Sequence, residues 1–225
     1  NPGFTLTSSP ESTQIRIDPT GAIHVTLGSP FWGNSPETMA TQIVAEQFQV
    51  DPSQVNIVYA DTQSGFNSTG PGGSRFTVMI AGAIVGAAKQ VKDKLLRVAG
   101  HMMEADTGDL EFRVGKIGVK GVPGKEKTIG EVALFAHYFR LNLPAGDAFA
   151  SGLDANYVYD HPLTTMPAAD RSHLGIFYPI MGHMCHLALV EVDPKTGKVA
   201  ILDYVAVHDA GTVVNPMTLA GHIRG

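Results

Sequence analysis

The amino-acid sequence predicts an α+β fold: two-layer sandwiches made of repeated β-β-α units, with one long buried helix. Two segments indicate the repeat, IRIDPTGAIHVTLG from Ile15 and VEVDPKTGKVAILDY from Val190, because each has the order strand, Asp-Pro, Thr-Gly, strand. Each is followed by a glycine-containing loop and a proline, Pro36 or Pro216, that can begin a helix. The uncharged stretch FTVMIAGAIVGAA, from Phe76, predicts the long helix. The alternative to a repeat is that the shared segment is only a common hairpin turn.

The remaining elements follow from hydrophobic periodicity and from turn residues. In chain order we expect a hairpin at 14–27, a helix at 36–48, a strand at 55–60, a helix from about 75 to 104, a hairpin at 110–122, a helix at 129–138, a hairpin at 187–207 and a helix from 216. Ser35 is a candidate N-cap of the first helix, and Thr128 is the expected cap of the helix at 129–138. Gly115 lies near the tip of the second hairpin.

This pattern predicts three parts. Residues 1–141 form a first α+β unit with the long helix, residues 142–180 form an irregular connection, and residues 181–225 begin a second α+β unit. Asn215 and Pro216 are a strong helix start, but only about ten residues follow. We therefore expect the second unit to be truncated and the chain to be a fragment of a longer polypeptide.

Composition excludes several classes of protein. The 225 residues are 44% hydrophobic and 16% charged, which is enough for a packed core and argues against disorder. A formal net charge of -5 argues against a nucleic-acid partner. The longest apolar run, residues 78–88, is too short to cross a membrane. Cys185 is the only cysteine, so no internal disulfide can form, and a reducing, cytoplasmic location fits.

The loop GPGGSR at 70–75 stands directly before the long helix. A helix start offers unpaired N–H groups and a partial positive charge, and glycine lets a ligand approach the backbone. Gly73, Ser74, Arg75 and Thr77 therefore form a candidate site for an anion such as phosphate. The loop lacks the spacing of a Walker A or dinucleotide-binding motif. The alternative is a flexible turn with Ser74 as an ordinary N-cap.

Other candidate residues have weaker contexts. The loop Gly28–Asn34 could present the Asn34 amide to a ligand, although its aromatic residues could instead pack on the core. His183, Cys185 and His186 suggest a metal, but alternation along a strand would place them on two faces, so we expect a sheet surface and no metal site. Acidic and histidine residues at 160, 161, 170 and 173 are expected to be solvated loop residues rather than catalytic groups.

Three segments taken together resemble one family. Residues 28–38, 70–77 and 210–225, in this order, are similar to the molybdopterin-binding large subunit of molybdenum hydroxylases, the family of xanthine dehydrogenase, aldehyde oxidase and aerobic carbon monoxide dehydrogenase. The resemblance implies that residues 1–141 are a first molybdopterin-binding unit. It also implies that Gly73, Ser74, Arg75 and Thr77 hold the phosphate end of molybdenum-molybdopterin, in some members a cytosine dinucleotide.

Two cofactor positions depart from the family pattern. The first loop usually reads Gln-Gly-Gln-Gly, whereas Gly33 is here followed by Asn34, and the later Gly-Gln is here Gly221-His222. The resemblance still implies that Gly33, Asn34 and His222 contact the cofactor. It implies no protein ligand to the metal, which the cofactor's dithiolene holds, and no catalytic residue within this chain.

The sequence therefore leads to one main hypothesis of function. The chain is a fragment of the cofactor-binding region of a molybdenum hydroxylase that oxidises an aldehyde, an N-heterocycle or carbon monoxide with oxygen derived from water. Iron-sulfur and FAD subunits or domains would be its partners, and the fragment alone is expected to be inactive and to lack the cofactor. The alternative is a non-catalytic binding or assembly module derived from the same fold.

Overall fold

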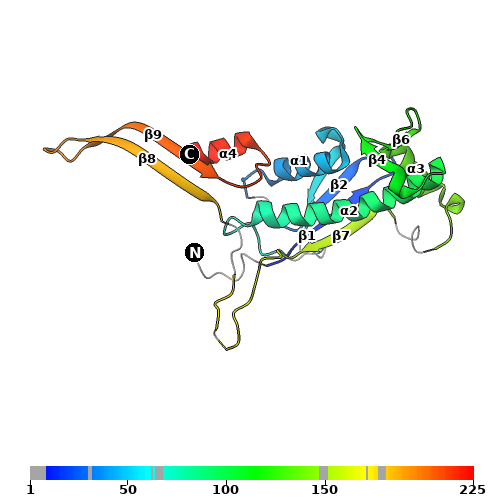
Figure 1. Cartoon of the computed structure of the whole chain (residues 1–225), viewed down its shortest axis with the longest axis horizontal. Coiled ribbons are helices and arrows are strands. Elements are labelled where there is room, and N and C mark those ends of the chain that lie inside the picture. The colour runs from blue at the N-terminus through cyan, green and yellow to red at the C-terminus, as the bar shows by residue number, and fades with distance from the viewer. Residues whose placement is uncertain are drawn as a thin grey trace. The chain divides into compact units, whose positions relative to one another are not determined.

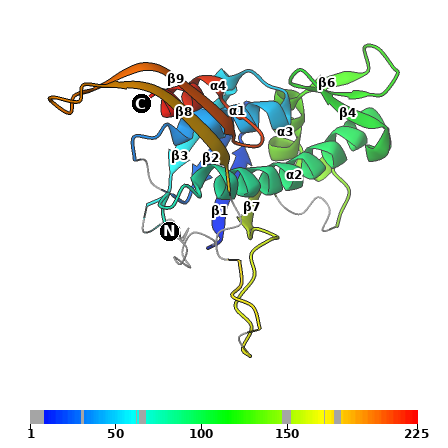
Figure 2. The same cartoon turned by 60° about the vertical axis from the view of Figure 1, so that its left-hand side comes forward.

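The computed structural model describes residues 9–29, 32–61, 63, 68–146, 152–170, 172–176 and 181–225. The chain divides into two compact units, residues 1–179 and 180–225. Figures 1 and 2 show the elements of both units. No helix in the described ranges is long and apolar enough to cross a membrane.

The first unit contains a four-stranded sheet in the order β3-β2-β1-β7. β1 (Glu11–Ile17) pairs antiparallel with β2 (Ile23–Leu27) and with β7 (Asp154–Tyr159), whereas β3 (Val55–Tyr59) runs parallel to β2. A parallel neighbour requires a crossover, and α1 (Pro36–Phe48) with the short 3-10 turn η2 (Pro52–Gln54) supplies it.

Two helices cover this sheet. α2 (Phe76–Met103) packs on β1 and β7, and α1 packs on β3 and on α2 (Figure 1). Every second side chain of β1 and β2 points toward the two helices. These side chains form an apolar layer of Ile15, Ile17, Ile23, Val25 and Leu27, each fully buried. This is a two-layer α+β arrangement, and α2 is the predicted long buried helix, with its apolar stripe against the sheet.

A smaller sheet follows the far end of α2. It contains β4 (Leu110–Arg113), β5 (Lys116–Val119) and β6 (Glu126–Thr128), with the 3-10 turn η3 (Thr107–Asp109) before it. Gly115 lies at the tip of the β4-β5 turn with a φ of 73°, as its position predicts. α3 (Ile129–Tyr138) follows and is capped by Thr128, whose hydroxyl accepts a hydrogen bond from the Glu131 N–H while the Glu131 carboxylate accepts one from the Thr128 N–H.

Two sequence-based expectations, and one of the alternatives, differ from the structure. The segment 142–180, expected to be an irregular connection, contains β7, and the 3-10 turn η4 (Arg140–Asn142) ends at its first residue. β7 is a strand because its backbone pairs with the edge of β1. Ser35 and Ser74 are not side-chain caps, because both have left-handed backbones, with φ of 52° and 57°, and neither α1 nor α2 has a side-chain cap.

The second unit repeats the order strand, strand, helix. β8 (His183–Val192) pairs antiparallel with β9 (Val199–Asp209), and α4 (Pro216–Arg224) follows. The β1-β2 and β8-β9 turns are both closed by an aspartate, Asp18 or Asp193, and contain a glycine with positive φ, Gly21 or Gly197. The β8-β9 hairpin is longer than the predicted range 187–207 and changes register between Leu189 and Val190.

Candidate functional site

The loop before α2 has an unusual backbone. Gly70, Gly73 and Ser74 have φ of 80°, 78° and 57°, and Arg75 is right-handed with φ of -84°. A left-handed residue followed by a right-handed one turns successive N–H groups toward the same side and forms an anion-binding concavity. Since α2 begins at Phe76, the helix dipole acts at the same place.

The side chains of this loop divide into two groups. Gly73, Ser74 and Thr77 are exposed, so this side of the loop is accessible to a ligand. Arg75 is 1% exposed and points into the protein instead. The loop therefore offers a concave backbone and two hydroxyls on its outer side, while its single guanidinium makes contacts on the inner side.

The inner side of the loop is held by β1. The Arg75 guanidinium forms an ion pair with the Glu11 carboxylate and donates hydrogen bonds to the carbonyl oxygens of Ser9 and Gly70, the latter at 2.9 Å. The Ser68 hydroxyl donates to the same carboxylate at 2.8 Å and accepts a bond from the Gly70 N–H at 3.0 Å. Sequence reasoning missed Glu11 and Ser68, because no local pattern marks a carboxylate at the start of a hairpin as buried.

The structure brings a second predicted loop next to the first. A Cβ placed on Gly70 would lie 3.8 Å from the Trp32 ring, which belongs to the loop that contains Gly33 and Asn34. Both Gly33 and Asn34 are exposed, and Gly33 has a φ of 79°. Trp32 is 66% exposed, so its side chain does not pack in the core.

A tyrosine joins the second loop's helix to the sheet. The Tyr59 hydroxyl, at the end of β3, donates a 2.8 Å hydrogen bond to the Glu37 carboxylate in the first turn of α1. Burial, and then this hydrogen bond, raise the pKa of Tyr59 well above its usual range. The phenol therefore stays protonated and holds the start of α1 against β3 at neutral pH.

The residues of these two loops fit a phosphate-bearing cofactor. A Cβ placed on Gly33 or Gly72 would meet nothing within 4 Å, so there is space beside the backbone. Gly72, Gly73 and Ser74 form an exposed concave turn at a helix start, the arrangement that binds phosphate oxygens in other proteins. The remaining candidate, His222, is exposed on α4 in the second unit, after the Asn215 side chain that accepts from the Thr218 N–H.

The structure does not support a metal-binding or catalytic role for the weaker candidates. His183, Cys185 and His186 lie on β8, and no group of three or more metal-binding side chains occurs among the described residues. The His186 ring instead packs on His208 and Tyr204, with a 2.7 Å hydrogen bond between Nδ1 and the tyrosine hydroxyl. Asp160, Asp170 and His173 are exposed, as expected for solvated loop residues, and His161 is half-buried.

Comparison with known proteins identifies the family of this chain. A family model for the molybdopterin cofactor-binding domain matches residues 1–225. The carbon monoxide dehydrogenase large chain of Hydrogenophaga pseudoflava is 32% identical over 215 residues, 96% of this chain and 24% of that protein. Subunit gamma of the 6-hydroxypseudooxynicotine dehydrogenase complex of Paenarthrobacter nicotinovorans is 33% identical, again over 96% of this chain and 25% of the relative.

A solved structure gives the same result. The crystal structure of quinoline 2-oxidoreductase from Pseudomonas putida 86 matches with a TM-score of 0.81 and 33% identity, over 96% of this chain and 25% of that one. The chain thus spans about a quarter of the length of these relatives. The resemblance inferred from three loops is confirmed across the whole chain, and the chain belongs to the molybdopterin cofactor-binding domain family.

Proposed function

We propose that this chain forms part of the cofactor-binding region of a molybdenum hydroxylase large subunit. The observation that carries the proposal is the exposed concave turn at Gly72–Ser74, at the start of α2 and beside the loop of Gly33 and Asn34. The family match and the oxidoreductase relatives support the same function. They do not favour a non-catalytic module.

The predicted residues have distinct roles in this proposal, and Arg75, predicted to hold the phosphate, is buried and supports the turn from its inner side instead. The N–H groups of Gly73 and Ser74, with the hydroxyls of Ser74 and Thr77, bind the phosphate of molybdopterin, which can carry a cytosine nucleotide. Gly33 lets the neighbouring loop approach the cofactor, and the Asn34 amide hydrogen-bonds it. His222, on α4, stays a predicted cofactor contact. When bound, the cofactor supplies the molybdenum redox chemistry, and this chain supplies binding, orientation and exclusion of water.

The wider activity follows as a proposal from the relatives. The complete protein oxidises an aldehyde, an N-heterocycle or carbon monoxide with oxygen from water, and passes electrons to iron-sulfur and FAD subunits or domains in the cytoplasm. We assign no catalytic residue to this chain. The 225 residues alone are not expected to retain the cofactor, because a partly open site leaves each anion contact in water, where it is weak.

Replacing both hydroxyls tests the proposed site. In the complete polypeptide, produced with its cofactor, Ser74→Ala/Thr77→Ala should raise the cofactor dissociation rate at least about tenfold, because a hydrogen bond to a charged group contributes roughly 1.5–3 kcal/mol. Molybdenum content by mass spectrometry and pterin content by fluorescence measure the loss. Thr107→Ala is the control, since Thr107 is also exposed but lies in η3, beyond the far end of α2. Unchanged contents in the double variant would contradict the proposal.

A further inference from the structure

The buried ion pair between Glu11 and Arg75 joins parts of the chain that are far apart in sequence. The Glu11 and Arg75 side chains are 0% and 1% exposed, and the two residues are 64 positions apart. One carboxylate oxygen of Glu11 accepts from both Arg75 and Ser68, and the other, Oε2, is buried without a hydrogen-bond partner in the described part of the chain. A carboxylate is rarely this deeply buried unless it is paired.

These contacts hold both ends of the loop. Ser68 lies two residues before the loop and Arg75 is its last residue, and both bind the same Glu11 oxygen. Between them, Gly70 is held at both backbone groups: its N–H donates to Ser68 and its carbonyl accepts from Arg75. The exposed residues Gly72–Ser74 are therefore flanked by residues that the Glu11 carboxylate holds in place.

The charge of Arg75 is matched by this carboxylate. Since the guanidinium is engaged by Glu11 and by two carbonyl oxygens, its first effect is on the shape of the loop. A buried ion pair is weak grounds for stability, because desolvation offsets much of the attraction. Its clearest effect is to select one geometry, here the left-handed turn at Gly73 and Ser74.

We infer that Glu11 is a positioning residue for the anion-binding turn, acting through Arg75 and Ser68. The inference rests on the proposed function, in which that turn holds the cofactor phosphate. Glu11 does not touch the ligand. It keeps the turn preorganised, so that little ordering is required when the phosphate binds.

Two variants test this positioning role. Glu11→Gln keeps the shape of the side chain but removes the charge, and Ser68→Ala removes one of the two bonds to the carboxylate. In the complete protein each should raise the cofactor dissociation rate, by about tenfold for Glu11→Gln. In the cofactor-free form each should also speed amide hydrogen exchange at Gly70 and Met79, whose N–H groups are bonded to the Ser68 hydroxyl and to the Arg75 carbonyl oxygen. Ser68→Thr retains the hydroxyl and should restore both rates to within about twofold of the wild type.

Matched controls separate the possible outcomes. Glu131→Gln alters a carboxylate that also accepts backbone and hydroxyl hydrogen bonds, but at the start of α3, and should change neither rate at the loop. If Glu11→Gln fails to fold, the Ser68→Ala and Ser68→Thr pair decides. Wild-type rates in Glu11→Gln and Ser68→Ala, or faster exchange without faster release, would overturn the positioning role. If Ser74→Ala/Thr77→Ala also kept its cofactor, the proposed function itself would fail.

Discussion

At the scale of single residues, two glycines allow α2 to lie against β7. A Cβ placed on Gly82 would come within 2.4 Å of the Tyr159 ring, and one on Gly86 within 2.2 Å of the Tyr157 ring. Both tyrosines point from β7 toward the helix. The ring atoms nearest to the added Cβ are Cγ, Cδ1 and Cε1 in each case. Because a ring held at Cγ cannot swing away easily, glycine is required at these points for the helix to approach the strand.

Substitution of Gly86 tests this close approach. Alanine normally favours a helix over glycine by about 1 kcal/mol, but here it should lower the free energy of unfolding by roughly 1–3 kcal/mol, because its methyl overlaps the Tyr157 ring. Urea unfolding followed by circular dichroism measures the change. Gly221→Ala in α4 is the control, because its Cβ would meet nothing within 4 Å. A Gly86→Ala protein as stable as the wild type would show that the tyrosine moves freely.

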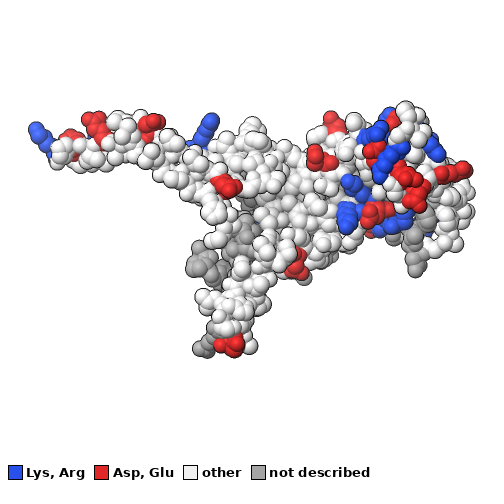
Figure 3. Space-filling model, in the orientation of Figure 1, with Lys and Arg blue, Asp and Glu red and all other residues white. Residues whose placement is uncertain are grey.

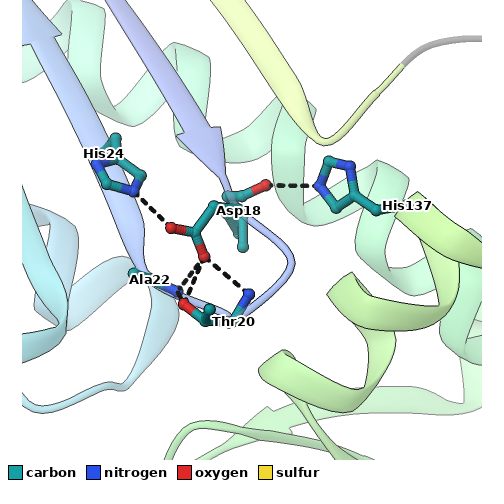
Figure 4. A network of polar contacts seen from close by, with 6 residues as sticks. Asp18, Thr20, Ala22, His24 and His137 are labelled. Atoms are coloured by element: carbon teal, nitrogen blue, oxygen red, sulfur yellow. Dashed lines mark hydrogen bonds and ion pairs between the residues drawn. The ribbon is translucent and has the colours of Figure 1, made fainter.

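At the scale of elements, the β1-β2 hairpin is closed by a polar network around Asp18 (Figure 4). Its carboxylate accepts hydrogen bonds from the Thr20 hydroxyl at 2.6 Å and the Thr20 N–H at 2.9 Å, and contacts His24 Nε2 at 2.8 Å. Next to it, His137 of α3 bonds the carbonyl oxygen of Ile17 at 2.9 Å. The turn thus closes the hairpin, and the adjacent contact joins β1 to α3.

This network predicts an acid-sensitive contribution to stability. The hydrogen bond from the Thr20 hydroxyl, followed by that of His24, holds the pKa of Asp18 well below its usual range. An unfolded aspartate has a pKa of about 3.9, so the folded state binds fewer protons. The stabilisation is therefore present above about pH 4 and is lost as the pH falls below it.

The measurement compares pH profiles of unfolding. Between about pH 5 and pH 3 the wild type should lose on the order of 1 kcal/mol more of its free energy of unfolding than Asp18→Asn, which has no charge to lose. Asp160→Asn removes an exposed carboxylate and should keep the wild-type profile. Parallel profiles for the wild type and Asp18→Asn would contradict the role of the network.

Elements with local signals could be predicted from the sequence, and elements that depend on distant partners could not. The helices at 36–48 and 129–138 have the predicted bounds, because periodicity and, at Thr128, a capping box define them. β7 was missed because its strand character depends on pairing with β1, far away in the chain. Ser35 stands at the N-cap position of α1 as predicted, but its side chain makes no cap hydrogen bond, and the alternative of a cap at Ser74 fails likewise, because residue type does not reveal a left-handed backbone.

The candidate site follows the same division. The position of the loop at a helix start was predictable, since a glycine-rich segment before an apolar run is a local pattern. The inward direction of Arg75 was not, because it depends on Glu11, 64 positions away. The adjacency of Trp32 and Gly70 likewise comes from tertiary packing.

At the scale of the whole molecule, charge is distributed unevenly over the first unit. Lysine, arginine and acidic residues gather around α3, β4 and β6, on the face shown in Figure 3. The first half of α2, residues 76–88, has no charged side chain. The turn at Gly72–Ser74 therefore stands at the neutral end of the helix, where hydrogen bonds and the helix dipole, rather than a cluster of cations, would attract an anion.

The β8-β9 hairpin has apolar side chains on both of its faces. Leu187 pairs with Val205, and beyond the register shift Val190 pairs with Ile201. Leu187 is 68% exposed and Ile201 is 65% exposed. A hairpin of two strands is marginal in water on its own, and an apolar surface of this kind normally covers or is covered by protein.

We therefore expect the isolated 225-residue chain to expose this hairpin and to associate through it. Leu187→Thr/Val205→Thr should reduce binding of the dye ANS and shift the chain toward the monomer in sedimentation velocity, because the pair lies on one face of the ribbon. Leu141→Thr is the control, since Leu141 is fully exposed in η4 of the other unit; it should leave both measurements unchanged. A wild-type chain that is monomeric and binds no dye would contradict the expectation, and so would equal effects of the two substitutions, because a hairpin-specific surface should respond only to its own residues.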